Sequence, residues 1–99
     1  AYEIADLVVL PSQSESFGYS ALESLSLGIP TILNNIPTYN EVSIGSENYY
    51  LFNNTVETLY SSLSVAINNG LERVKQPNEW QNQYSIVLFG QRYLNLLIK

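Results

Sequence analysis

A strand–loop–helix unit near the start of the chain constrains its fold more than any other feature. The apolar run 7–10, Leu-Val-Val-Leu, lacks alternation, which is typical of a strand buried on both faces of a parallel sheet. The following segment, 11–18, is polar and predicts a loop. A short helix then runs to about Leu27, and Gly28 and Pro30 predict its end.

Short strands and helices continue to alternate along the rest of the chain. Strands are predicted at 31–33 and 49–52, and the loop between them, 36–48, can hold a short helical turn at 38–43. Such alternation predicts a parallel sheet with right-handed crossovers. The predicted fold class is therefore α/β, a partial Rossmann-like parallel sheet with flanking helices, with residues 1–99 as a single fragment.

Two amphipathic helices are predicted in the second half of the chain. The first covers 56–68, follows the capping segment 53–55 and closes at Asn69 and Gly70. Its predicted buried stripe consists of Val56, Leu59, Leu63, Ala66 and Ile67. The second follows Pro77 and covers 78–97, and its apolar positions are Trp80, Tyr84, Val87, Leu88, Tyr93, Leu94 and Leu97. We expect Trp80 and Tyr84 to be core or domain-contact residues.

At the other end of the chain, residues 1–5 are expected to be the last turn of a helix or a short lead-in.

Two carboxylates frame the predicted loop and the first helix. Glu15 lies in the loop and Glu23 lies on the helix. In open α/β sheets, ligands sit beyond the carboxyl ends of the strands, where this loop lies. Carboxylates accept hydrogen bonds from hydroxyls, and free amides at a helix start can receive a phosphate. Gly18 has no Cβ, so a ligand could approach the backbone closely at this position.

Each of these residues also has a purely structural interpretation. The spacing of Ser20 and Glu23 matches a capping box, so Glu23 is either a ligand contact or a cap of its own helix. Without its neighbours in the motif, Glu15 would be read as an ordinary solvated acid in a loop, and Gly18 could serve only to form a turn. Three further residues have structural alternatives as well. Gly28 could serve only to end the helix, Glu41 could be a local cap or loop contact, and Tyr19 could simply pack against its neighbours.

Composition excludes several classes of function. The chain contains neither cysteine nor histidine, which excludes disulfides, thiolate metal sites and histidine-based triads within it. The net charge is -5, and the basic residues are Arg73, Lys75, Arg92 and Lys99. None of them lies near the acidic motif, so a nucleic-acid binder, which needs clustered positive charge, is not expected. No metal site and no nucleic-acid partner are predicted.

Hydropathy and chain ends add further expectations. No apolar run approaches the roughly 20 residues that span a bilayer, and no signal-peptide pattern opens the chain. Because the chain begins within a pattern and without Met, we expect a fragment of a longer protein. Missing upstream strands would leave an open sheet edge, through which self-association is expected.

The motifs, taken in order, resemble those of the family 4 retaining glycosyltransferases, also called glycosyl transferases group 1. The resemblance rests on 5–12 (Ala-Asp-Leu-Val-Val-Leu-Pro-Ser), on 15–23 (Glu-Ser-Phe-Gly-Tyr-Ser-Ala-Leu-Glu) with its E-x7-E spacing, and on 27–31 (Leu-Gly-Ile-Pro-Thr). Glu41 matches the acid that follows the family's second strand. The likeness spans almost the whole chain and implies the C-terminal part of a GT-B fold, which binds the donor.

The resemblance implies a role for each matching position. Glu15, the catalytic candidate, would accept hydrogen bonds from the donor sugar, and Glu23 would hold the ribose. Donor-binding positions implied through the backbone are Phe17, Gly18, Tyr19, Ser20 and Ala21, and Glu41 would lie near the donor. The implied reaction transfers a sugar from a nucleotide diphospho-sugar to an acceptor hydroxyl with retained anomeric configuration. No cofactor or metal is implied.

This chain would supply only half of a donor site. A helix N-terminus contributes about 0.3–1 kcal/mol per favourable charge, too little for a diphosphate leaving group. In the family an upstream Arg/Lys pair supplies the cations, and the N-terminal GT-B domain supplies the acceptor wall. We therefore expect the 99-residue chain to be inactive alone. The whole protein is expected in the cytoplasm or at the cytoplasmic face of the membrane, and the resemblance does not specify its acceptor.

Two other functions stay open at this point. A GT-B-related nucleotide-sugar epimerase would share the fold, but it usually relies on histidine and other acids that this chain lacks. A non-catalytic nucleotide-binding or interaction module would retain the fold without depending on Glu15 or Glu23. Donor binding and product analysis separate the three possibilities.

Overall fold

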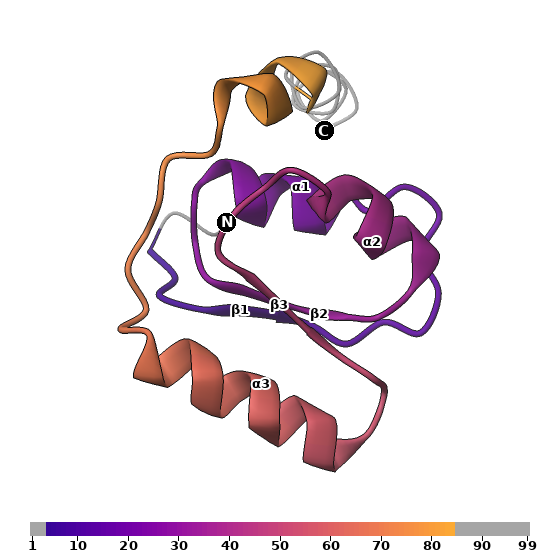
Figure 1. The fold of residues 1–99 in the computed structure, drawn as a ribbon. Helices are drawn as coiled ribbons and strands as arrows, with labels where there is room; N and C mark the ends of the chain where they lie inside the picture. Colours follow the sequence, from indigo (N-terminus) through magenta and orange to yellow (C-terminus); the bar gives the residue numbers. More distant parts are fainter. Residues whose placement is uncertain (1–3, 85–99) are drawn as a thin grey trace.

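A three-stranded parallel sheet forms the centre of the structure, a computed structural model that describes residues 4–84 (Figure 1). The strands, in their order across the sheet, are β1 (Val8–Leu10), β2 (Thr31–Asn34) and β3 (Tyr49–Phe52). In the parallel register Val9 is the partner of Ile32, and Ile32 is the partner of Tyr50. The predicted α/β class and all three strands are confirmed.

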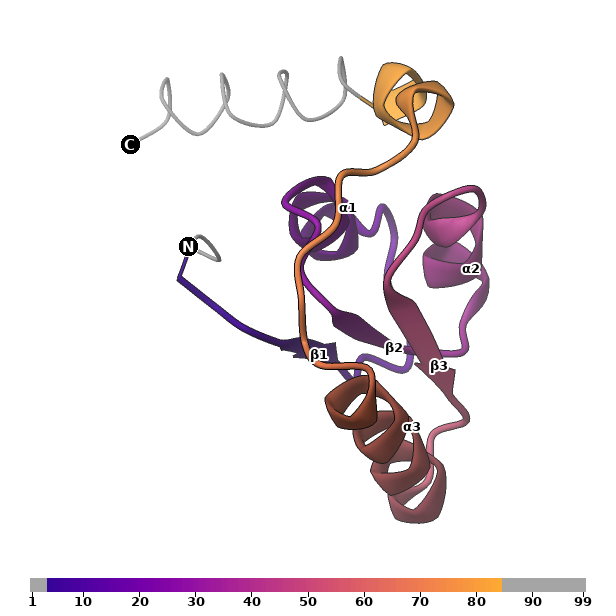
Figure 2. The same cartoon turned by 60° about the vertical axis from the view of Figure 1, so that its left-hand side comes forward.

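Helices cover both faces of the sheet. They are α1 (Tyr19–Ser26), α2 (Pro37–Ser43) and α3 (Val56–Asn68). α1 and α2 lie on one face and α3 on the other, while the helical segment 78–84 lies outside the α1 layer (Figures 1 and 2). The short helical turn predicted at 38–43 is thus confirmed as α2. This Rossmann-like arrangement is consistent with part of a GT-B domain.

The core has two parts, one on each face of the sheet. One lies between the sheet, α1, α2 and Trp80, and it includes Leu22, Leu25, Leu33, Tyr39 and Val42. The other lies under α3 and consists of Ile32, Phe52 and Ala66, with half-buried residues such as Leu59 and Leu63 around it. The prediction that Trp80 belongs to the core is confirmed. The helix predicted at 78–97 is confirmed at 78–84, and its remainder lies outside the described residues, as do residues 1–3.

Burial of β1 differs from the prediction. All residues of β2 are buried, but Val9 in β1 is 37% exposed. The expectation that 7–10 is buried on both faces is therefore wrong at Val9. The physical reason is that β1 is an outer strand of the described sheet and α3 packs mainly against β3, so less of β1 is covered.

The start of α1 also differs from the prediction. Its N-cap is Gly18, whose φ of 71° places it in the left-handed region, and the Leu22 N–H donates to the Gly18 carbonyl at 3.0 Å. Ser20 is therefore the second residue of the helix, and the predicted capping box of Ser20 and Glu23 is wrong. No side chain caps this helix. The cap interpretation of Glu23 is thereby removed.

α3 confirms its predicted bounds and corrects its predicted buried stripe. Thr55 caps the helix by accepting a hydrogen bond from the Thr58 N–H at 3.2 Å. Val56 is 79% exposed and Ile67 57% exposed, so both were wrong as stripe residues. The sheet contacts the face that carries Ser62 and Ala66; Val56 lies in the first turn, beyond that contact, and Ile67 is rotated off it.

The segment after α3 crosses the N-terminal edge of the sheet. The Val74 N–H donates to the Gly28 carbonyl at 3.0 Å, just before β2 begins. Asn48, just before β3, donates from Nδ2 to the Gly28 carbonyl at 3.0 Å and to the Glu72 carbonyl at 2.8 Å. Because this crossing occupies the N-terminal edge, the carboxyl edge is left to the loops that follow β1 and β2.

Candidate functional site

The start of α1 provides the candidate site with free backbone donors. Since Gly18 is the N-cap, the N–H groups of Tyr19, Ser20 and Ala21 precede the first intrahelical donor, Leu22. Three amides at the carboxyl edge of a parallel sheet form an arrangement that can receive an anion. The Ala21 side chain is fully buried in the core, so only its backbone can serve a ligand.

The two carboxylates of the motif lie on either side of this helix start. Glu15 is exposed in the loop between β1 and α1, and Glu23 is half-buried on the second turn of α1. The exposed Glu15 carboxylate is open to hydroxyl donors from solvent or from a ligand.

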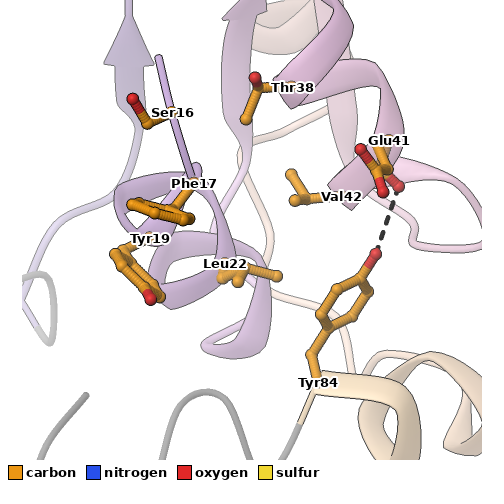
Figure 3. Close-up of a pocket in the computed structure, with 8 residues that line it drawn as sticks. All are labelled: Ser16, Phe17, Tyr19, Leu22, Thr38, Glu41, Val42 and Tyr84. Carbon is orange, nitrogen blue, oxygen red and sulfur yellow. Dashed lines mark hydrogen bonds between the residues drawn. The ribbon is translucent and has the colours of Figure 1, made fainter. Parts of the chain in front are cut away.

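A pocket of about 300 Å³ lies between α1, α2 and the helical segment 78–84 (Figure 3). Its lining consists of Ser16, Phe17, Tyr19, Leu22, Thr38, Glu41, Val42 and Tyr84. The structure thus brings together Phe17, Tyr19 and Glu41 from the predicted site. The remaining predicted residues, which are outside this lining, are Glu15, Gly18, Ser20, Ala21 and Glu23.

Two aromatic rings form one wall of the pocket. Phe17 is 65% exposed, and its ring is stacked on that of Tyr19 with centroids 5.5 Å apart and an interplanar angle of 27°. The two rings lie together beside the pocket in Figure 3. An exposed aromatic pair of this kind offers an apolar surface for stacking. Tyr19 therefore packs on Phe17 and still presents a ring to the pocket.

Tyr84 closes the other side of the pocket. Its hydroxyl donates to the Glu41 backbone carbonyl at 3.3 Å, and the Glu41 side chain is exposed (Figure 3). Burial raises the pKa of the Tyr84 phenol above 10.0, and the negative charge of Glu41 adds to this effect. The phenol consequently stays protonated as a hydrogen-bond donor at neutral pH.

Positive charge lies away from the candidate site. In the described part of the chain the basic residues are Arg73 and Lys75, both on the segment that crosses the opposite edge of the sheet. Arg73 donates from Nη2 to the Ala5 carbonyl at 3.2 Å.

Residues 4–84 hold no group of three or more side chains suited to a metal ion. Within the same range, no helix has both the length and the apolar character to cross a bilayer.

Sequence reasoning missed Thr38 and Asn34. The Thr38 hydroxyl donates to the Glu15 carbonyl, and Asn34 Nδ2 donates to the Ser12 carbonyl at 3.1 Å. The spacing of Thr38, Glu41 and Val42 puts them on one face of α2, so Thr38 could have been expected to lie beside the candidate residue Glu41. No sequence signal connected either residue with the loop before α1.

The fold and the site together define a Rossmann-like α/β unit with a candidate ligand edge at the start of α1. The chain belongs to the glycosyl transferases group 1 family, whose model matches residues 1–84. Two curated relatives from Escherichia coli, both named O-antigen biosynthesis glycosyltransferase WclY, are 51% identical to it over 37 residues. That match covers 37% of this chain and 10% of each relative's length. No solved structure matches the chain.

Proposed function

We propose that this chain supplies donor contacts in a family 4 glycosyltransferase that moves a sugar from a nucleotide diphospho-sugar to an acceptor hydroxyl with retention. The observation that carries the proposal is the start of α1, where three free amides lie between Glu15 and Glu23. Membership in the glycosyl transferases group 1 family supports it.

The proposal gives each group one task. Glu15 accepts hydrogen bonds from donor-sugar hydroxyls and is the catalytic candidate, while Glu23 accepts them from the ribose. The amides from Phe17 to Ala21 face the sugar and the diphosphate. Glu41 lies beside the same loop through the shared pocket. No cofactor or metal is proposed for this part of the protein.

The proposed reaction needs positive charge from outside the described residues. Arg73 and Lys75 lie on the segment that crosses the far edge of the sheet, and stabilising a diphosphate leaving group normally recruits cations. We therefore propose that a partner domain of the same protein completes the cleft, and that the 99-residue chain alone transfers no sugar. The relatives' name, which mentions O-antigen biosynthesis, supports a saccharide acceptor. Cytoplasmic location and self-association stay predictions.

The test uses the full-length protein and three substitutions, Glu15→Gln, Glu23→Gln and Glu57→Gln. Calorimetric titration with UDP-, GDP-, ADP- and dTDP-sugars should show binding that falls roughly 10- to 100-fold in the first two variants, since each loses hydrogen bonds to a charged group. Glu57 lies on the first turn of α3, on the other face of the sheet, and serves as the matched control.

Each alternative has its own outcome in this experiment. Donor binding that is unchanged in both site variants, or absent in the wild type, would overturn the proposal in favour of a non-catalytic module. A product that is an epimerised nucleotide sugar, formed without an acceptor, would instead show an epimerase. Transfer with inverted anomeric configuration would contradict the retaining mechanism alone.

A further inference from the structure

We propose that Thr38 is a positioning residue that fixes the loop carrying Glu15. Thr38 lies on the first turn of α2, 23 positions from Glu15 along the chain, and its Oγ1 donates to the Glu15 carbonyl at 2.5 Å. This hydrogen bond joins the loop after β1 to the helix after β2. The inference rests on the proposed role of Glu15 and adds the group that holds it.

The methyl group of Thr38 faces Gly18, at the end of the same loop. A Cβ built on Gly18 would lie 3.2 Å from Thr38 Cγ2 and 3.5 Å from Val42 Cγ1. The backbone of Gly18 is therefore packed against one face of α2. Threonine carries a hydroxyl and a methyl group on a single, conformationally restricted Cβ. Thr38 consequently holds the loop by its hydrogen bond to Glu15, while its methyl group occupies the space beside Gly18.

The rest of the loop depends on few attachments. Asn34, buried at the end of β2, donates to the Ser12 carbonyl at 3.1 Å. Within residues 4–84, this bond and the one from Thr38 are the hydrogen bonds that link the loop to the β2–α2 segment, and residues 13–17 are exposed. Without the Thr38 hydroxyl, the bond from Asn34 to Ser12 would be the remaining hydrogen bond between the loop and this segment in residues 4–84. A catalytic group misplaced by about 1 Å can lose roughly 100-fold in rate.

Two substitutions of Thr38 separate its hydroxyl from its methyl group. Thr38→Val keeps the shape and removes the hydroxyl, whereas Thr38→Ser keeps the hydroxyl and removes the methyl group that lies beside Gly18. In the full-length protein, cleavage after Glu15 by a glutamyl endopeptidase, followed by mass spectrometry, should become roughly fivefold faster in Thr38→Val, the change that losing a typical hydrogen bond produces. Thr38→Ser should stay within about twofold of wild type, because the hydrogen bond carries most of the constraint.

The same variants are titrated with UDP-glucose, GDP-mannose and dTDP-glucose in wild-type and Glu15→Gln backgrounds. A residue that acts through Glu15 should weaken binding when Glu15 is present, roughly tenfold for Thr38→Val, and change it less than about twofold when Glu15 is already replaced. Thr38→Ala repeats the measurement with a smaller side chain, should Thr38→Val disturb the packing of α2.

The outcomes distinguish this inference from the proposed function. If cleavage after Glu15 is equally fast in Thr38→Val and wild type, the positioning role is wrong. Equal losses of binding in both backgrounds would also overturn it, because Thr38 would then act independently of Glu15. If no nucleotide sugar binds, or Glu15→Gln binds as wild type does, the proposed function fails, and the cleavage measurement alone decides whether Thr38 holds the loop.

Discussion

Gln76 hydrogen-bonds both backbone groups of Glu47, as a neighbouring strand would. Its Oε1 accepts from the Glu47 N–H at 2.6 Å and its Nε2 donates to the Glu47 carbonyl at 2.9 Å. The same Nε2 donates to the Leu25 carbonyl in the last part of α1 at 2.9 Å. One buried side chain thus connects the crossing segment, α1 and the residues that lead into β3.

Replacing this amide should destabilise the protein strongly. Gln76→Glu keeps the shape but removes both Nε2 donors and sets a carboxylate against two carbonyls. We expect the free energy of unfolding to fall by about 2–4 kcal/mol, because buried backbone acceptors lose their partners. Chemical denaturation of the full-length protein measures this change. The exposed Gln83 receives the same substitution as a control, and equal effects at both positions would contradict the role of Gln76.

Gly28 and Gly45 should respond differently to the same substitution. Both have positive φ, 72° and 82°, but a Cβ on Gly28 would lie 1.7 Å from the Val74 carbonyl oxygen, whereas nothing lies within 4 Å of one on Gly45. Gly45→Ala should cost only the left-handed strain of about 1–2 kcal/mol. Gly28→Ala should cost at least about 4 kcal/mol, since the crossing segment must also move. Similar melting temperatures for the two variants would show that the crossing segment is loosely packed.

The two predicted capping sites can be compared by alanine substitution. Thr55 accepts a hydrogen bond from the Thr58 N–H, so Thr55→Ala should lower the free energy of unfolding by about 1 kcal/mol. Ser20 is exposed inside α1 and caps nothing, so Ser20→Ala should change it by less than about 0.5 kcal/mol. Urea denaturation of both variants provides the measurement. A larger loss for Ser20→Ala would restore the capping box.

Alkaline pH should weaken the attachment of the segment 78–84. The pKa of Tyr84 is raised by burial first and by the charge of Glu41 second, so the unfolded chain releases this proton more readily than the folded chain. Its contribution to stability is fully present below the ordinary tyrosine pKa of 10.0 and is lost as the pH rises from there through the higher pKa of the folded state. Glu41→Gln should lower the pKa of Tyr84, observed as an earlier shift of its labelled Cζ resonance. A Tyr84 titration that is identical in Glu41→Gln would exclude the contribution of Glu41.

Local sequence patterns predicted most of the elements. The strands at 31–33 and 49–52, the helix at 56–68 and the capping segment 53–55 before it were all found from apolar periodicity and turn chemistry, which act over a few residues. The same local patterns gave the wrong N-cap at Ser20. There the helix start depends on Gly18, whose conformation is fitted against Thr38 and Val42, about 20 positions away.

By itself, the sequence determined the α/β class, the order of elements and the candidate residues Glu15 and Glu23. Tertiary structure decided that Glu23 is not a cap, that Phe17 and Tyr19 stack beside a pocket, and that Thr38 and Asn34 hold the loop. The physical reason is the distance along the chain over which each kind of interaction acts. Periodicity and turn preferences act between neighbours in the chain, whereas a hydrogen bond from α2 to the β1–α1 loop exists only once the parallel sheet has set the two segments side by side.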